Sequence, residues 1–369
     1  MLKFNLESYK GSCKYLILFN VMFKKDSLNK DQFLDDMGIT PSSYRRAEKS
    51  EQNIGVRSVM QLSKHFGYKL MNDSMIDELE NFSNKIYYNM YYKIFDTYEE
   101  DLEYISNLEK EKYLIFPIIK LLKLFLQINA PTYTSDTLKN SENLYNEIKD
   151  YKEFYLDTFS AVFELFEISF EDSLLDRAKF KKYDNGMAYF ILSSRCHLQQ
   201  KYVESLYFAN KSKEILLLDG NYKRLFYLNH IIMNSLIKVE SYDECYEIAY
   251  KQKLALEALK MNGYELNIAK DYIVLSLTGM KKYTEVHSLL ANKEKYNLTE
   301  LTCLLISKYM IDKNEYIEYF KNEIDLDSFE SNIAEFYSLL NKYLVHSEKR
   351  ALNKLEINNL SFPFIKYLK

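Results

Sequence analysis

Turn-forming residues are scarce in this chain. Its 369 residues include only eight glycines and four prolines. Sandwiches and barrels need many tight turns, and nucleotide-binding α/β folds need glycine-rich loops, so the sequence disfavours both classes. Forty-seven per cent of the residues are hydrophobic, which provides for a large core and argues against disorder. The sequence therefore predicts an all-α protein with two domains or one extended repeat array.

Cysteine and histidine follow no recognisable site pattern. The four cysteines are far apart with no CxxC pair, and the five histidines form no HExxH motif. We therefore expect no disulfide framework, no metal site and no cofactor. The apolar run over residues 15–23 is interrupted by Asn20 and is too short to span a bilayer. We expect a cytoplasmic protein without a membrane partner.

Charge is unevenly distributed along the chain. Residues 1–72 contain 12 basic and 7 acidic residues, a net charge of +5. The whole chain carries −4, which leaves −9 for residues 73–369. A basic head on an acidic body suggests an anionic partner for the head, although a solvated charge imbalance explains the numbers equally well.

The head has the pattern of three short helices. Lys30–Met37 has helical apolar spacing and is followed by Gly38, a residue that commonly ends helices in the left-handed conformation. Thr40 and Pro41 then suit the N-cap and the first position of a second helix, which runs to about Lys49. A third helix is expected over Val56–Phe66. Two short helices joined by a glycine-containing turn form a helix-turn-helix unit.

Residues from about 13 to 72 resemble the helix-turn-helix domains of the Xre/Cro-repressor type. The resemblance rests on Gln32 in the scaffold helix, the turn Met37–Thr40, Glu48 late in the recognition helix, and the closing pattern Leu-x-x-x-Phe-Gly at residues 62–67. Leu34 departs from it, since the family usually has alanine there. The first helix, Tyr15 to Phe23, is unusually apolar, which suggests a dimer contact or an interdomain contact.

This resemblance implies which residues contact DNA. A recognition helix places its first-turn side chains at base edges while nearby basic residues hold phosphates. Arginine can contact guanine with two hydrogen bonds. The resemblance puts Ser42, Ser43 and Arg46 in the major groove, and Arg45, Lys49 and Arg57 at phosphates. A solvated arginine pair is the alternative, and Tyr44 and Ala47 are expected to pack inward.

A repeat emerges after residue 150, beyond a connecting helix expected from Met75 to about Phe95. Five segments share a polar, an aromatic, a variable and an acidic residue in similar order, with aromatic residues 32, 40, 41 and 33 apart. Each follows an apolar helical stretch and opens another, so each marks the turn of a helix hairpin. The segments are Ser169–Ser173, Lys201–Ser205, Ser241–Cys245, Lys282–Val286 and Glu315–Tyr319.

These segments resemble the turn of tetratricopeptide repeats. The resemblance implies a right-handed superhelix with a concave face suited to extended peptides, whereas a general helical bundle with coincidental turns is the alternative. Asparagine there can both donate to and accept from a peptide backbone. The repeat alignment predicts a peptide-binding surface made by Tyr227, His230, Asn234, Lys238, Asn267 and Asp271.

The combination of head and body resembles the peptide-pheromone receptors of Gram-positive bacteria, the Rap–Rgg–NprR–PlcR–PrgX superfamily. The resemblance implies a transcription regulator that acts in quorum sensing, with double-stranded DNA, a short signalling peptide and a second copy of the chain as partners. The expected domains are a DNA-binding head (1–72), a connecting helix with the first hairpins (73–150), the repeats (151–349) and a C-terminal cap (350–369).

Two other classes of function remain open on sequence. In the first, the repeats bind a protein target as in the Rap proteins, and the helix-turn-helix is vestigial. In the second, the chain is an enzyme. We expect no enzymatic activity and no catalytic residues, because the sequence has no nucleophile elbow, P-loop, zinc signature or recognisable pair of catalytic carboxylates.

Overall fold

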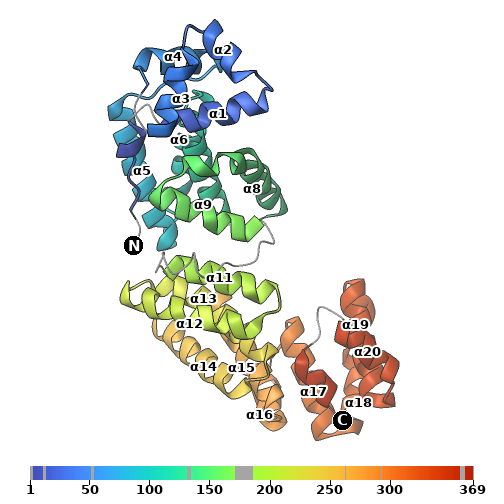
Figure 1. Ribbon diagram of the computed structural model, residues 1–369. Helices are drawn as coiled ribbons and strands as arrows, with labels where there is room; N and C mark the ends of the chain where they lie inside the picture. The colour runs from blue at the N-terminus through green and yellow to red at the C-terminus, as the bar shows by residue number, and fades with distance from the viewer. Residues whose placement is uncertain are drawn as a thin grey trace. The chain divides into compact units, whose positions relative to one another are not determined.

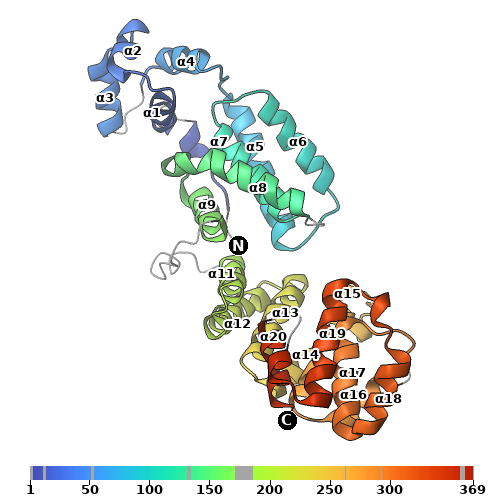
Figure 2. The ribbon, with the colours of Figure 1, turned by 90° about the vertical axis from the view of Figure 1, so that its right-hand side faces the viewer.

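The computed structural model describes residues 3–10, 14–50, 54–130, 134–170, 186–261, 263–291, 293–357 and 362–368. Its regular elements over these ranges are all helices, as Figures 1 and 2 show. The all-α expectation is therefore confirmed. The chain divides into two compact units, one formed by Met1–Ile191 and Leu218–Arg224, the other by Leu192–Leu217 and Leu225–Lys369.

The first unit contains the head and the helices that follow it. In chain order its elements are η1 (Glu7–Tyr9), α1 (Tyr15–Lys25), α2 (Lys30–Asp36), α3 (Pro41–Ser50), α4 (Val56–His65), α5 (Asp73–Tyr91), α6 (Tyr98–Lys110), α7 (Phe116–Ile128), α8 (Ser135–Ile148), η3 (Lys149–Phe154) and α9 (Asp157–Phe170).

The second unit contains the remaining helices, and both α11 and α13 begin in the first unit. Its elements are α11 (Gly186–Leu198), α12 (Tyr202–Leu218), α13 (Tyr222–Lys238), α14 (Tyr242–Ala258), α15 (Tyr264–Gly279), α16 (Tyr283–Leu290), α17 (Leu298–Ile311), α18 (Lys313–Glu323), η4 (Leu326–Ser328), α19 (Ser331–His346), α20 (Lys349–Ile357) and η5 (Pro363–Tyr367).

The three short head helices form where their sequence signals predict them. Asn29 caps α2 by accepting a hydrogen bond from the backbone of Gln32. Gly38, at φ +70°, ends that helix, and the backbone N–H of Ile39 bonds to the carbonyl of Leu34 at 2.8 Å. A left-handed residue closing the last turn in this way is a common helix ending, favourable for glycine because it has no Cβ.

Helix α1 is an intramolecular packing element. Six of its eleven residues are buried within this one chain. It packs against η3 of the same unit. Lys25 at its end forms a 2.9 Å ion pair with Asp150 and lies 4.7 Å from the centre of the Tyr151 ring. The apolar face of this helix therefore joins the head to the rest of the unit.

Further contacts fix the head against the helices that follow it. The rings of Tyr68 and Phe116 stack with centroids 4.8 Å apart. Lys69 forms an isolated parallel bridge with Tyr113, in which its N–H bonds to the carbonyl of Lys112 at 2.9 Å. The head is thus part of a larger packed unit, and α5 begins at Asp73, directly after it.

The connecting helix α5 ends earlier than its sequence predicts. It stops at Tyr91, where a helix to about Phe95 was expected, because Lys93 adopts a left-handed conformation with φ +55°. The backbone N–H of Ile94 then bonds to the carbonyl of Asn89 at 2.8 Å. The helix is therefore closed by a tight turn that contains no glycine.

The carbonyls at the end of α5 receive hydrogen bonds from residues far along the chain. Asn221 Nδ2 donates to the carbonyl of Tyr91 at 2.7 Å. Arg224, only 2% exposed, donates from Nε to that same carbonyl at 3.1 Å and from Nη2 to the carbonyl of Met90 at 2.5 Å. The Tyr91 hydroxyl donates to Asp219 Oδ2 at 2.5 Å. Residues 219–224 thus cap α5, whose final carbonyls have no partner within the helix.

Three hairpins of the repeat region share one turn. Each first helix ends with a left-handed residue, namely Gln200, Glu240 or Lys281, at φ between +61° and +63°. The next N–H bonds back to a carbonyl five residues earlier, as in Ser241 to Leu236 at 2.9 Å. The aromatic residue of the motif then begins the second helix. Three of the five predicted turn segments are therefore confirmed as turns.

The other two segments have different outcomes. The Glu315–Tyr319 prediction is wrong, because α18 already begins at Lys313 and the segment lies inside it. The turn lies earlier in the chain, at Asp312, which has an extended backbone. The Asp312 carboxylate caps α18 by accepting hydrogen bonds from the backbone N–H groups of Asn314 and Glu315. The first segment, Ser169–Ser173, begins within the last two residues of α9, and its residues 171–173 lie outside the described residues.

Small residues bring successive helices close together. Ser193 of α11 and Ser205 of α12 each donate to the other's carbonyl, at 3.0 and 2.9 Å, and both are fully buried. Ser235 of α13 donates to Ser205 Oγ at 3.3 Å. First helices of successive hairpins also contact each other, as the packing of α15 against α17 shows.

The C-terminal segment packs on the repeats. Helix α20 packs against α19, and η5 packs against α20. Phe364 is buried, and its ring stacks on Phe362 at 5.6 Å and lies 6.3 Å from that of Tyr242. Phe364 thus lies beside the start of α14, more than 100 residues earlier in the sequence.

Candidate DNA-reading helix and peptide pocket

The predicted DNA-contacting residues lie at the surface of the head. Tyr44 and Ala47 of α3 are buried in the head core, as expected from the sequence. The predicted contacts are all exposed, five on α3 and one in the first turn of α4. A helix exposes one face when the other enters a core. The exposed set comprises Ser42, Ser43, Arg45, Arg46, Lys49 and Arg57.

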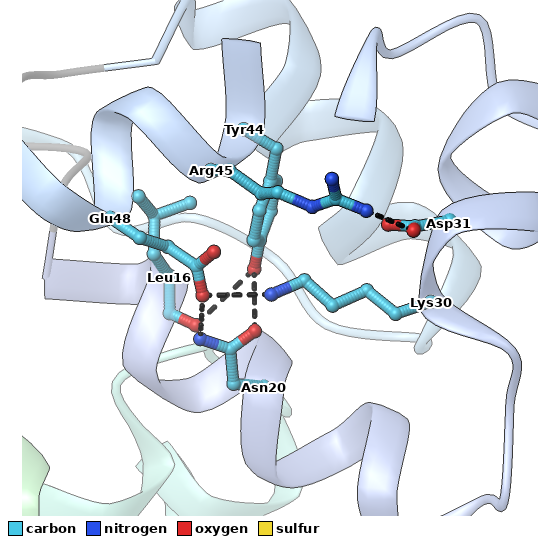
Figure 3. Close-up of polar contacts among 7 residues, drawn as sticks. All are labelled: Leu16, Asn20, Lys30, Asp31, Tyr44, Arg45 and Glu48. Atoms are coloured by element: carbon cyan, nitrogen blue, oxygen red, sulfur yellow. Dashed lines mark hydrogen bonds and ion pairs between the residues drawn. The ribbon is translucent and has the colours of Figure 1, made fainter. Parts of the chain in front are cut away.

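The two adjacent arginines have different surroundings. Arg45 pairs with Asp31, which lies in the first turn of α2 (Figure 3). Arg46 Nη2 donates to Ser43 Oγ at 3.3 Å. An exposed ion pair contributes little to stability, about 1 kcal/mol or less. Asp31 also offsets the positive charge of Arg45, a residue that the sequence predicts to contact phosphate.

A polar cluster fixes the orientation of α3. Glu48 Oε1 accepts hydrogen bonds from Asn20 of α1 at 2.5 Å and from Lys30 of α2 at 2.7 Å. The Tyr44 hydroxyl donates to Asn20 Oδ1 and to the carbonyl of Leu16, both at 3.3 Å. Figure 3 shows these side chains meeting between the three helices. Burial, followed by the charge of Glu48, raises the pKa of Tyr44, so its hydroxyl stays protonated and donates.

The second unit contains a cavity of about 400 Å³. It lies among the first helices of three successive hairpins, α13, α15 and α17, with one residue from the C-terminal segment. Four of the six predicted peptide-binding residues line it. Tyr227 and Asn267 are exposed and do not line this cavity. The lining residues are His230, Asn234, Ile237, Lys238, Ile268, Asp271, Tyr272, Leu275, Thr299 and Phe362.

A hydrogen-bond chain behind the cavity holds Asn234. Its Nδ2 lies 3.1 Å from His197 Nε2, and His197 Nδ1 lies 2.9 Å from Ser235 Oγ. An amide nitrogen only donates, so Nε2 accepts and the imidazole proton resides on Nδ1. The amide nitrogen of Asn234 is therefore used internally, which leaves its carbonyl oxygen to accept from a ligand.

Burial disfavours the charged forms of the groups around this cavity. It lowers the pKa of Lys238, His230 and His197, the last also because His230 and Lys238 are near. Burial raises the pKa of Asp271, although a 2.8 Å hydrogen bond from Asn297 Nδ2 opposes the rise. The groups around the cavity are only partly shielded from water, since His230 and Asp271 are half-buried and Lys238 is exposed.

We expect the second unit to lose stability below pH 6.5, the ordinary pKa of histidine. Both half-buried imidazoles have lowered pKa values. The unfolded chain therefore binds more protons than the folded chain in this range, and stability falls as the pH falls. Thermal unfolding followed at pH 7.5 and pH 5.5 measures the effect. His197→Gln combined with His230→Gln should flatten the dependence, whereas His346→Gln at an exposed position should leave it in place. An unchanged slope in the double variant would contradict the prediction.

Six residues that contact residues of the two sites or line the cavity were not selected from the sequence. In the head these are Asn20, Lys30 and Asp31. In the second unit they are His197, Asn297 and Phe362. The repeat spacing could have found one of them, because His197 lies five residues before Tyr202, just as Ile237 lies five before Tyr242.

No helix among the described residues is both long and apolar enough to cross a membrane. Within the same ranges, no group of three or more His, Cys, Asp or Glu side chains is arranged to hold a metal ion. Comparisons with protein-family models, curated proteins and solved structures find no match to this chain.

Proposed function

We propose that this protein is a cytoplasmic transcription regulator that binds operator DNA through α3 and a short signalling peptide through its repeat region. The observation that carries the DNA-binding part is the exposed basic face of α3, a helix that the Glu48 cluster ties to α1 and α2. Basic side chains in this position suit phosphate and base contacts.

The peptide-binding part is supported by the cavity among α13, α15 and α17. It places polar and charged side chains beside aliphatic and aromatic ones, so a ligand could make both hydrogen bonds and apolar contacts there. The shared hairpin turns, the buried serines and the contacts between successive first helices support stacking of the repeats as a right-handed, tetratricopeptide-like superhelix.

In this proposal the protein acts as a homodimer. Two heads would occupy half-sites about one helical turn apart, roughly 34 Å, and the peptide would favour one spacing of the heads. The head contacts α5, α7 and η3 of the same unit. A change of spacing therefore requires movement of larger parts of the chain, rather than of the head alone.

Binding of the purified full-length protein to DNA from its own promoter region tests the proposal. We expect nanomolar to micromolar binding at low salt, with affinity that changes when the cognate peptide is added. Fluorescence anisotropy with labelled duplex measures both effects, and a duplex of unrelated sequence is the control. Failure to bind any promoter fragment, with or without peptide, would contradict DNA regulation. Retention of a protein target without DNA binding would favour an interaction module.

A further inference from the structure

Asn234 stands at the cavity end of a chain of hydrogen bonds that crosses α13, α11 and α12. Its Nδ2 donates to His197 Nε2 at 3.1 Å, and His197 Nδ1 donates to Ser235 Oγ at 2.9 Å. Ser235 Oγ donates in turn to Ser205 Oγ at 3.3 Å, and Ser205 Oγ donates to the carbonyl of Ser193 at 2.9 Å. Asn234 is the one member of the chain that lines the cavity. All four bonds therefore point away from the cavity.

This chain fixes which way the Asn234 carboxamide faces. An amide nitrogen only donates and an amide oxygen only accepts, so turning the amide over would bring its oxygen to His197 Nε2. The imidazole proton and the Ser235 hydroxyl would then have to change as well. The three serines are fully buried, and aligned bonds in such surroundings strengthen one another. The carboxamide is therefore held with its nitrogen at His197.

The surroundings of His197 favour the form of the ring that the chain requires. Only a neutral imidazole can accept a hydrogen bond at Nε2. Burial lowers the pKa of His197, and the nearby His230 and Lys238 lower it further, so the neutral ring is favoured. The ring of Tyr202, at the start of α12, lies with its centre 5.4 Å from that of His197. His197 itself does not line the cavity, so it can influence a ligand there only through Asn234.

The carbonyl oxygen of Asn234 is the atom that remains for a ligand. It accepts no hydrogen bond from any residue that the structure describes. It is also accessible, unlike Asn229 Oδ1 of the same helix, which is buried. Building on the peptide-binding role proposed above, we infer that His197 is a positioning residue, which holds Asn234 so that this oxygen accepts a hydrogen bond from a backbone N–H of the peptide. Every residue except proline carries such a donor, so the bond holds the backbone whatever the side chains are.

The tautomer of His197 tests the hydrogen-bond chain without any ligand. Nuclear magnetic resonance of the full-length protein labelled with ¹⁵N-histidine shows which ring nitrogen carries the proton, and the signal missing from His197→Gln identifies the residue. We expect the proton on Nδ1 at neutral pH. A proton on Nε2 would mean that the amide oxygen of Asn234 faces His197, and that result would overturn the inference.

Peptide affinity tests the positioning role. The probe is the member of a random hexapeptide mixture that the full-length protein retains best, identified by mass spectrometry and resynthesised with a fluorescent label. Loss of one hydrogen bond between neutral groups lowers affinity by about threefold to tenfold. We expect His197→Leu to have an effect of this size in the wild-type background and none in the Asn234→Ala background. Ser307→Ala, which changes a buried serine outside the chain, should leave the affinity unchanged.

The outcomes separate this inference from the wider proposal. Equal weakening by His197→Leu in both backgrounds would overturn the positioning role while leaving peptide binding intact. Copies of the hexapeptide methylated at one backbone nitrogen each should include one that binds the wild type more weakly but not Asn234→Ala, and the absence of such a copy would overturn the N–H contact. If no peptide is retained, peptide binding itself fails and the inference with it, whatever the tautomer. Circular dichroism establishes that each variant is folded, and Ser235→Ala, a smaller change in the same chain, replaces His197→Leu if that one is not.

Discussion

Replacing Arg224 with alanine is expected to destabilise the first unit by about 3 kcal/mol. The side chain is buried and donates to the carbonyls of Met90 and Tyr91 at the end of α5. Its guanidinium also lies 5.2 Å from the centre of the Phe190 ring. The substitution removes bonds from a charged donor, leaves the Met90 carbonyl without this donor and opens a cavity, and each of these effects is unfavourable.

Hydrogen exchange at the C-terminal turn of α5 gives the local measurement for this variant. We expect faster exchange there than in the wild-type protein, together with a lower denaturant midpoint. Arg224→Lys keeps the charge but loses the planar fork, so its effect should be intermediate. The neighbouring Lys223 is exposed, and Lys223→Ala should change stability by no more than about 0.5 kcal/mol. Unchanged exchange in Arg224→Ala would show that this cap does not hold α5.

Replacing both Arg45 and Arg46 with alanine is expected to weaken operator binding by about 100-fold or more. One lost base contact costs about 1 to 3 kcal/mol, and one lost phosphate contact lowers the salt slope by about 0.9. Both side chains are exposed on α3, so the fold should be little affected. Titration of labelled operator at several salt concentrations gives the affinity and the slope together.

A substitution at Asp31 is expected to change DNA affinity in the opposite direction in the same assay. Its carboxylate pairs with Arg45, so Asp31→Asn should free that arginine and raise DNA affinity severalfold. The same change in the Arg45→Ala background should have a smaller effect, because the pairing partner is gone. If the double arginine variant binds operator with unaltered affinity and slope, α3 is not the DNA-contacting helix.

The head could be predicted from sequence because its signals are local. Asn29 and Gly38 begin and end α2 through bonds to residues within five positions of themselves. Caps and turns of this kind depend on short-range backbone geometry, which the residue type specifies. The Glu48 cluster could not be predicted in this way, since Asn20 lies 28 residues from it and Lys30 lies 18 away.

The residues of the cavity likewise divide into those that the sequence could predict and one that it could not. The repeat spacing was sufficient to select His230, Asn234, Lys238 and Asp271, because residues at matching points of stacked hairpins lie on the same side. Spacing alone could not select Phe362. That residue reaches the cavity because the C-terminal segment returns to the repeats, and such long-range contacts have no local periodicity.

The scarcity of glycine by itself determined the fold class, since long helices need few special backbone conformations. It did not limit the number of tight turns. Nine non-glycine residues among those the structure describes adopt positive φ, including Gln200, Glu240 and Lys281 in the three matching turns. Such a conformation costs a non-glycine residue roughly 1 kcal/mol, and packing of the two joined helices offsets that cost. Which helices pack together, and hence where turns, caps and cavity form, was decided only by the tertiary structure, because burial is shared between residues that are distant in sequence.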